Sequence, residues 1–276
     1  MQLKNSAVLI PGASRPIGRA IARKFGNEGA FLILPHFDWP ESTVEMEKEF
    51  KNSGFSFLTY SIDLCNENAV KQFVFEVQNH VNQLQFLVNN IERGGMPVVH
   101  GSYDKEHNKD QWDLEIATTL KAKWLLYHHF SQIIKPSSNG AIVNISSIAA
   151  ITGRSGPAAL FFNDGFCAAN RGINSFTESW ARECAPNIRV NEVMLGLINS
   201  RHGPGTRGWD VLTEKEKLEL NKHTLLKRTG TPEEVADVVY FLAVEATYIT
   251  GATLKMDGGF TLGGAEVPQM PQGILE

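Results

Sequence analysis

Short apolar runs alternate with longer amphipathic stretches along most of this chain. The alternation is typical of β-α-β units, in which each helix returns the chain to start another parallel strand. It predicts a doubly wound parallel sheet of about seven strands with helices on both faces. The expected strands are 7–10, 31–34, 56–61, 86–89, 141–145, 189–193 and 253–256. The expected helices are 17–28, 41–52, 66–82, 110–134, 165–184 and 232–244.

No internal repeat, low-complexity tract or linker divides the chain. A chain of 276 residues with 42% hydrophobic content can bury one large core. We therefore expect a single domain over 1–276, with a core at about 5–262 and a tail at 263–276. Whether the tail reaches a neighbouring subunit or stays disordered is open. Two irregular stretches, 93–110 and 196–228, are expected to cover a cleft at the carboxyl ends of the strands.

Charge and cysteine content exclude several functions. A net charge of -4, with basic residues scattered, argues against a nucleic-acid partner. The cysteines Cys65, Cys167 and Cys184 lack the spacing of a zinc site or a disulfide framework, so we expect no metal and free thiols. No apolar run approaches the roughly 20 residues of a membrane span, and the N-terminus leads straight into a strand. These features predict a cytoplasmic protein with no membrane contact.

The first expected strand runs into a turn at residues 11–19, which precedes a helix. Gly12 and Gly18 permit a tight turn and a close approach of phosphate to backbone N–H groups at the helix start. The turn therefore predicts a site for the pyrophosphate of a dinucleotide. Pro16 lacks an N–H group and adds ring atoms there. Either it impairs phosphate binding, or it only stiffens the turn.

The turn resembles the Thr-Gly-x-x-x-Gly-x-Gly signature of the short-chain dehydrogenase/reductase family, with Pro11 and Pro16 replacing the threonine and the middle glycine. The run 166–179 resembles that family's Tyr-x-x-x-Lys helix. The resemblance covers about residues 5–262 and implies a single Rossmann-like domain. Further matches are 62–64, 87–90, 142–147, 191–196, 228–236, 248–251 and 257–259.

The resemblance implies NADP or NAD as cofactor. Arg15 keeps the basic position that favours a 2′-phosphate, whereas His36 replaces the acid that would hold a ribose diol. Glu92 stands where the family has a glycine close to the cofactor ribose. Its carboxylate would crowd the site and repel phosphate, unless it turns outward. The residues expected to bind the cofactor are Gly12, Ser14, Arg15, Ile17, Gly18, His36, Asp63, Leu64, Asn90, Ile91, Gly196 and Ile198.

The resemblance also assigns the catalytic positions. In the family, a tyrosine exchanges the proton, a lysine lowers the pKa of that tyrosine, a serine holds the carbonyl oxygen and an asparagine supports a water relay. These four positions carry Phe166, Asn170, Ser147 and Thr119 in this chain. Only Ser147 is retained, because phenylalanine has no exchangeable proton and asparagine has no charge.

A shift of alignment does not restore the missing groups. No tyrosine occurs between residues 147 and 170, and no lysine between Lys135 and Lys215. Loss of a positioned acid typically costs about 10²–10⁴ in rate. Arg154, Arg171 and the pair His128 and His129 are the candidate substitutes in the sequence, and paired helix histidines more often serve other roles.

We interpret the chain as a catalytically inactive member of an oxidoreductase family. The expected role is a structural or regulatory subunit of a homo- or hetero-oligomer (dimer or tetramer), with an active relative as one partner. Two alternatives remain open. One is an active NAD(P)-dependent oxidoreductase with altered acid chemistry, and the other is a sensor that binds a nucleotide or an acyl-CoA. The sequence names no substrate or pathway.

Overall fold

The computed structural model describes residues 3–92, 99, 101, 105–106, 109–134, 139–200, 207–265 and 267–273. Its centre is a seven-stranded parallel sheet with the order β3-β2-β1-β4-β5-β6-β7. The predicted doubly wound sheet is therefore confirmed. The strands are β1 (Ala7–Leu9), β2 (Phe31–His36), β3 (Phe57–Ser61), β4 (Phe86–Asn89), β5 (Gly140–Ser147), β6 (Ile188–Leu195) and β7 (Thr253–Met256).

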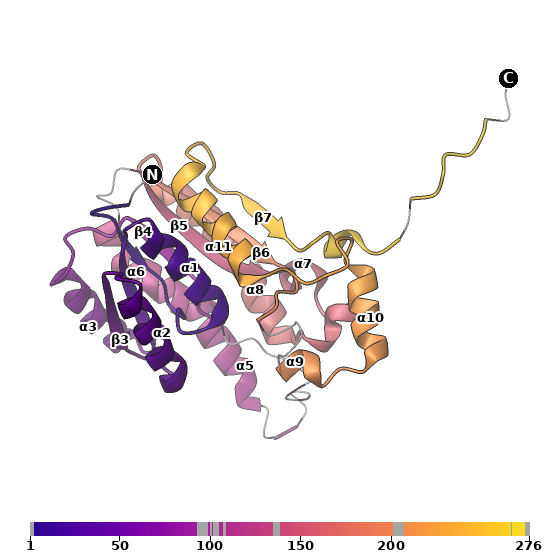
Figure 1. Cartoon of the computed structure of the whole chain (residues 1–276), viewed down its shortest axis with the longest axis horizontal. Helices are drawn as coiled ribbons and strands as arrows, with labels where there is room; N and C mark the ends of the chain where they lie inside the picture. The colour runs from indigo at the N-terminus through magenta and orange to yellow at the C-terminus, as the bar shows by residue number, and fades with distance from the viewer. Residues whose placement is uncertain are drawn as a thin grey trace.

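Helices cover both faces of this sheet (Figure 1). One face packs against α1 (Pro16–Asn27), α2 (Pro40–Asn52) and α11 (Pro232–Tyr240). The opposite face packs against α3 (Glu67–Gln78), α6 (Ala122–Ile134) and α8 (Asp164–Cys184). The other elements are α5 (Lys109–Glu115), η2 (Ile116–Lys121), α7 (Ala149–Thr152), η3 (Pro157–Leu160), α9 (Arg207–Asp210), α10 (Glu214–His223), η4 (Phe241–Glu245) and η5 (Phe260–Leu262).

Strands β1, β2 and β4 are nearly unbroken runs of apolar residues, without alternating polar positions, because both faces of the sheet are buried there. Val8 packs in the core on the α1 side, and the next residue, Leu9, packs in the core on the α3 side. Successive side chains point to opposite faces of a strand, so each short strand supplies both cores.

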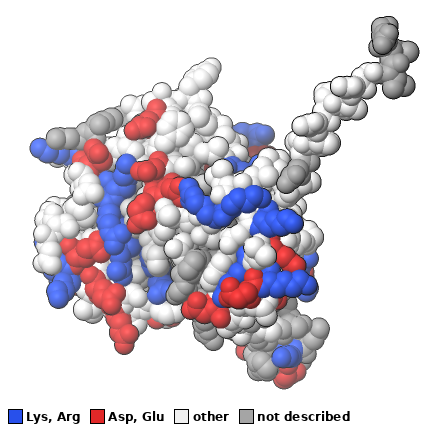
Figure 2. Space-filling model, turned by 45° about the vertical axis from the view of Figure 1, so that its right-hand side comes forward, with Lys and Arg blue, Asp and Glu red and all other residues white. Residues whose placement is uncertain are grey.

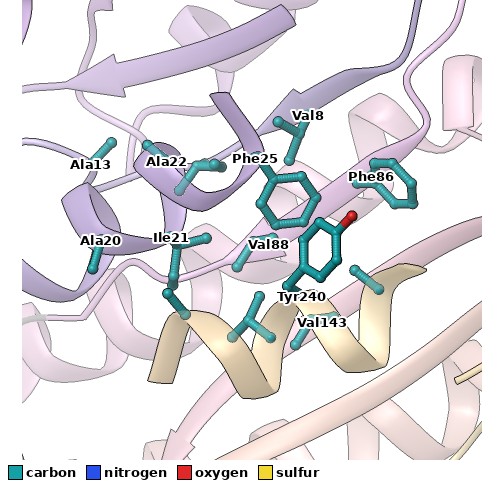
Figure 3. Packing of buried hydrophobic residues seen from close by; sticks show 14 of the residues in the cluster. Val8, Ala13, Ala20, Ile21, Ala22, Phe25, Phe86, Val88, Val143 and Tyr240 are labelled. Atoms are coloured by element: carbon teal, nitrogen blue, oxygen red, sulfur yellow. The ribbon is translucent and has the colours of Figure 1, made fainter. Parts of the chain in front are cut away.

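Phe25 of α1 belongs to the core on the α1 side of the sheet. Its ring centroid is 5.6 Å from that of Phe86 on β4 and 5.5 Å from that of Tyr240 on α11 (Figure 3). The ring is fully buried, and Val8 and Val88 of the sheet lie beside it. These contacts fasten α1, and with it the helical end of the predicted phosphate turn, to the sheet.

The helix expected over 110–134 is interrupted. The chain forms α5, then one stretch of π-helix (η2), then α6. A π-helical stretch shifts the following side chains around the helix axis, and such bulges often occur at functional sites. Helix α11 likewise continues into a π-helical stretch, η4. Apolar periodicity alone did not reveal either of them.

The structure describes one of the two irregular stretches more fully than the other. The connection expected over 196–228 contains the helices α9 and α10. Most of the stretch 93–110 lies outside the described residues. Thr231 caps α11 with a capping box that includes Glu234. Asp63 accepts a hydrogen bond from the backbone N–H of Cys65 and forms a turn, and Asn66 caps α3.

The tail leaves the body of the molecule in an extended path (Figure 1), and its Val267 and Met270 are exposed. Basic and acidic side chains are interspersed on the face shown in Figure 2. No helix in the described ranges has both the length and the apolar character needed to cross a membrane.

Candidate functional site

A cavity of about 380 Å³ lies at the carboxyl ends of the central strands. The strand order reverses between β1 and β4, and ligands of open α/β sheets bind in the crevice beyond such a switch point. The structure brings every residue predicted to bind the cofactor into the wall of this one cavity. They are Gly12, Ser14, Arg15, Ile17, Gly18, His36, Asp63, Leu64, Asn90, Ile91, Gly196 and Ile198.

The glycine turn packs directly against the end of β4. A Cβ atom added to Gly18 would lie 2.4 Å from the Gly12 carbonyl oxygen and 2.7 Å from the Asn90 side-chain nitrogen. Gly12 has a φ of 74°, a conformation that side chains other than glycine rarely adopt. Asn90 closes the contact by donating a hydrogen bond to the carbonyl of Pro11 at 3.3 Å. The turn therefore needs both glycines for its own backbone path.

Pro16 is the first residue of α1, and Arg15 is its N-cap without a side-chain capping bond. The N–H group of a first helical residue has no partner within the helix, so proline is well tolerated there. This position fits the interpretation in which Pro16 stiffens the turn. It also removes one of the donors that a helix start offers to an anion.

Aromatic residues at the end of β2 extend the cavity wall, and sequence reasoning missed them. Phe37 and Trp39 both line the cavity and are about half exposed. The guanidinium carbon of Arg15 lies 4.2 Å from the centre of the Trp39 ring, and its Nη1 donates to the Ser42 hydroxyl at 3.4 Å. Burial lowers the pKa of the neighbouring His36, which favours its neutral form.

Two of the four predicted catalytic positions lie in the cavity wall. Ser147 ends β5, and its Oγ accepts a hydrogen bond from the backbone N–H of Ala149 at 3.2 Å. Phe166 lies in the first turn of α8, is only 3% exposed and stacks on Phe162 with 5.8 Å between ring centres. The cavity wall therefore presents a hydroxyl group and an apolar ring.

The other two positions lie behind the wall, fully buried. Thr119 of η2 donates from Oγ1 to a Glu115 carboxylate oxygen at 3.4 Å. Asn170 donates from Nδ2 to the carbonyl of Phe166 at 2.9 Å. Its Oδ1 has no hydrogen-bond partner in the described part of the chain. Neither side chain reaches the cavity.

None of the candidate substitutes lines the cavity. Arg154 pairs with Asp164 at 3.1 Å on the surface, and Arg171 is exposed. His128 stacks on Trp124, and His129 lies 3.3 Å from a Glu67 oxygen. Within the described residues, the cavity wall contains no tyrosine and no lysine, whereas Glu92 is part of it.

Sequence reasoning also missed a group of buried charges. Lys123 of α6 donates from Nζ to the carbonyl oxygens of Ile91 at 2.7 Å and Thr119 at 3.0 Å. Burial is the main cause that lowers its pKa to about 8. A single charged residue inside the apolar run 122–126 was the signal that could have identified it.

Glu192 of β6 and Glu115 of α5 are the acidic members of this group, and both are fully buried. The Glu192 carboxylate accepts hydrogen bonds from the Ser146 hydroxyl, from Asn174 Nδ2 at 3.3 Å and from the Thr253 hydroxyl at 3.0 Å. In the described part of the chain, no His, Cys, Asp and Glu side chains form a group of three that could hold a metal ion.

Comparison with known proteins yields one consistent family. The family model described as enoyl-(acyl carrier protein) reductase matches residues 12–261. The 3-oxoacyl-(acyl-carrier-protein) reductase FabG of Thermotoga maritima is 31% identical over 266 residues, which cover 95% of this chain and 100% of that protein. The uncharacterized oxidoreductase YxbG of Bacillus subtilis is 32% identical over 267 residues, which cover 94% of this chain and 92% of that protein.

Solved structures of similar proteins point to the same family. A short-chain dehydrogenase/reductase from Serratia marcescens superposes with a TM-score of 0.80 at 25% identity, covering 95% of this chain and 100% of the other. A 3-oxoacyl-(acyl-carrier protein) reductase from Brucella melitensis, determined with bound NAD, gives a TM-score of 0.77 at 26% identity, with coverage of 94% and 92%. The similarity therefore spans nearly the whole chain, including the glycine turn and α8.

Proposed function

The chain belongs to the short-chain dehydrogenase/reductase family, and we propose that it is a member that binds a nicotinamide dinucleotide without turning over a carbonyl substrate. One observation carries the proposal: the buried ring of Phe166 and the hydroxyl of Ser147 line one cavity, and no tyrosine or lysine joins them among the described residues. A carbonyl oxygen held by Ser147 would find no phenol to protonate it.

The residues of the cavity fit the dinucleotide itself. Gly12 and Gly18 leave the backbone of the turn open to phosphate, and the first turn of α1 faces the same space. Asp63 and Leu64 at the end of β3 would lie against the adenosine, and Gly196 and Ile198 after β6 against the other end. A bound nicotinamide dinucleotide supplies or accepts a hydride, whereas the protein must supply the proton.

We further propose that the protein acts as a structural or regulatory subunit in a homo- or hetero-oligomer with subunits of the same fold. Exposed aromatic side chains on the helices beside the cavity support this role. Trp112 of α5 is 41% exposed, and Trp124 of α6 is 38% exposed. Large aromatic residues are enriched in protein interfaces, where they bury much area at low entropic cost. An active relative is the partner that would give such a subunit a role in catalysis.

The first experiment is a titration of the pure protein with NADH and with NADPH, followed by nicotinamide fluorescence. We expect micromolar binding, with NADPH preferred if Arg15 contacts a 2′-phosphate. Gly18→Ala is the matched control, because its Cβ would collide with Gly12 and Asn90 and close the turn. Absence of binding at millimolar cofactor would reject the dinucleotide part of the proposal.

The second experiment tests turnover. The relatives are named as reductases of 3-oxoacyl groups, so a 3-oxoacyl thioester is the appropriate substrate. We expect no substrate-dependent oxidation of NADPH by the pure protein. Oxidation at an ordinary enzymatic rate, abolished by Ser147→Ala, would instead establish an active reductase with altered acid chemistry.

A further inference from the structure

Three charged side chains lie in the interior next to the cavity, each on a different element. Lys123 of α6 is 1% exposed, and Glu115 of α5 and Glu192 of β6 are 0% exposed. Burying a charge is costly unless it is paired and hydrogen-bonded. None of the three belongs to the predicted cofactor contacts or to the four catalytic positions. Their burial therefore calls for a physical explanation of its own.

Lys123 connects two parts of the cavity wall from behind. Its Nζ is 2.7 Å from the carbonyl oxygen of Ile91, a wall residue that follows β4. It is also 3.0 Å from the carbonyl oxygen of Thr119 in η2, next to the wall residue Thr118. One ammonium group thus holds the end of β4 against the π-helical stretch.

Three carboxylates on other elements act on this ammonium through space. Glu92 follows β4, Glu115 lies on α5 and Glu192 on β6, and all three raise the pKa of Lys123. Burial lowers the pKa more strongly, to a net value of about 8, so the group is mostly charged at neutral pH. Glu92 is the one of these carboxylates whose residue lines the cavity.

Helix α8, which packs beside η2, places no buried positive charge near these carboxylates in the described part of the chain. Asn170 of α8 is fully buried and neutral. Helix α8 packs closely on η2, since a Cβ atom added to Gly172 would lie 2.9 Å from the Leu120 side chain. Lys123 is therefore the buried positive charge at this junction among the described residues.

We propose that Lys123 is a positioning residue for the cavity, which fixes Ile91 and Glu92 against η2 and offsets the negative charge of Glu92 toward an anionic dinucleotide. The second part of this role rests on the proposed function, because it requires a dinucleotide in the cavity. The first part concerns the wall alone and is measurable without a ligand.

A double-mutant cycle tests the charge offset. NADH affinity is measured by fluorescence at pH 7 and 0.15 M salt for the wild type, Lys123→Met, Glu92→Gln and the double variant. We expect Lys123→Met to weaken binding by about tenfold or more, because Glu92 is left without its offset. The double variant should recover most of that loss, since the neutral amide introduced by Glu92→Gln needs no offset. Independent, additive effects would overturn the offset.

Lys121→Met is the matched control. It removes the same charge two positions away, at the exposed end of η2. An exposed charge is screened within about 8 Å at this salt concentration, so we expect a change of less than about twofold. An equal loss in the Lys121 and Lys123 variants would show a net-charge effect and contradict the proposal.

The pH dependence of NADH affinity separates an effect of the Lys123 charge from an effect of the space that its side chain fills. Wild-type affinity for NADH should fall between pH 7 and pH 9, as Lys123 loses its proton near pH 8. The Lys123→Met variant should show no such fall. A purely structural role of the side chain would leave the two profiles parallel, which would overturn the proposal.

Hydrogen exchange tests the wall without a ligand. We expect faster amide exchange in peptides covering 86–92 and 116–123 of Lys123→Met, but not of Lys121→Met. If wild-type protein binds neither NADH nor NADPH, the proposed function fails while this readout still decides the role of Lys123. If Lys123→Met does not fold, the wild-type peptide 86–92 should lose protection between pH 7 and 9, after correction for the intrinsic rate. Unchanged protection would reject the wall-fixing role.

Discussion

The backbone N–H of Phe166 donates a hydrogen bond to the side-chain oxygen of Asn163 at 2.7 Å. Asn163 is the N-cap of α8, so this bond fixes where the helix begins relative to the ring in the cavity wall. The helix that would carry a catalytic tyrosine is thus built and placed. Under the proposed function, the chain differs from an active member of the family in the side chain at this position.

Restoring a phenol at this position should create activity. Phe166→Tyr places an exchangeable proton on a backbone that already lines the cavity with Ser147. We expect substrate-dependent NADPH oxidation with a 3-oxoacyl thioester to appear at about 10² times the background rate measured with the wild type, the low end of the range for a positioned acid, because no lysine lowers the pKa of the phenol. Steady-state rates of wild type and variant provide the measurement.

Phe162→Tyr is the control for the phenol. Phe162 stacks on Phe166 in the same apolar cluster but does not line the cavity. A hydroxyl group there should leave the rate at the wild-type level. If both variants react equally fast, or if Ser147→Ala leaves the new activity unchanged, the cavity is not where the reaction occurs.

The ring of Phe25, which packs α1 against β4 and α11, should contribute strongly to the free energy of unfolding. Phe25→Ala removes a fully buried ring between Phe86 and Tyr240 (Figure 3), and we expect a loss of about 3–5 kcal/mol in the free energy of unfolding. Phe75→Ala removes a ring of the same size that is 69% exposed, and should change it by less than about 0.5 kcal/mol. Urea unfolding of both variants measures this, and equal losses would contradict the packing described.

Acid should weaken the cap of α11. The pKa of Glu234 is lowered from its ordinary 4.5 to about 2, first by the hydrogen bonds from Arg228 and then by the backbone N–H of Thr231. A lowered pKa in the folded state means that this contribution is complete above about pH 4.5 and is lost as the pH falls toward 2. Between these values, Arg228→Met should lose less stability than the wild type in urea unfolding. Parallel curves would show that the pair contributes nothing.

The thiol of Cys167 should react slowly. Burial raises its pKa from the ordinary 9.0 to about 11, because the uncharged thiol is favoured away from water. Since the thiolate is the reactive form, alkylation by iodoacetamide at pH 8 should be about a hundredfold slower in folded than in urea-unfolded protein. Mass spectrometry of the peptide that contains Cys167 measures both rates. Equal rates would show that the thiol is not held as the structure places it.

The set of cavity residues was predictable from sequence to a large extent. The glycine turn after the first expected strand singled out Gly12, and the resemblance to the family's motifs singled out Asp63 and Asn90. The three residues converge because each follows a parallel strand, and parallel strands bring their carboxyl ends to one edge. The sequence did not identify Phe37 and Trp39 as cavity residues, because they follow β2 in a loop. A loop has no regular side-chain periodicity from which the direction of a side chain could be predicted.

The sequence by itself determined the parallel sheet, the glycine turn and the absence of a tyrosine and a lysine from the Ser147-to-Asn170 stretch, because these are matters of residue identity and local period. Only the tertiary structure decided which of the four predicted catalytic positions reach the cavity. Thr119 and Asn170 lie behind its wall, whereas Phe166 lies in it. The structure also brought Lys123 and Glu192, which are far apart in sequence, into the same buried charge group. Electrostatic interactions act through space, so such a group becomes visible only when packing brings distant elements together.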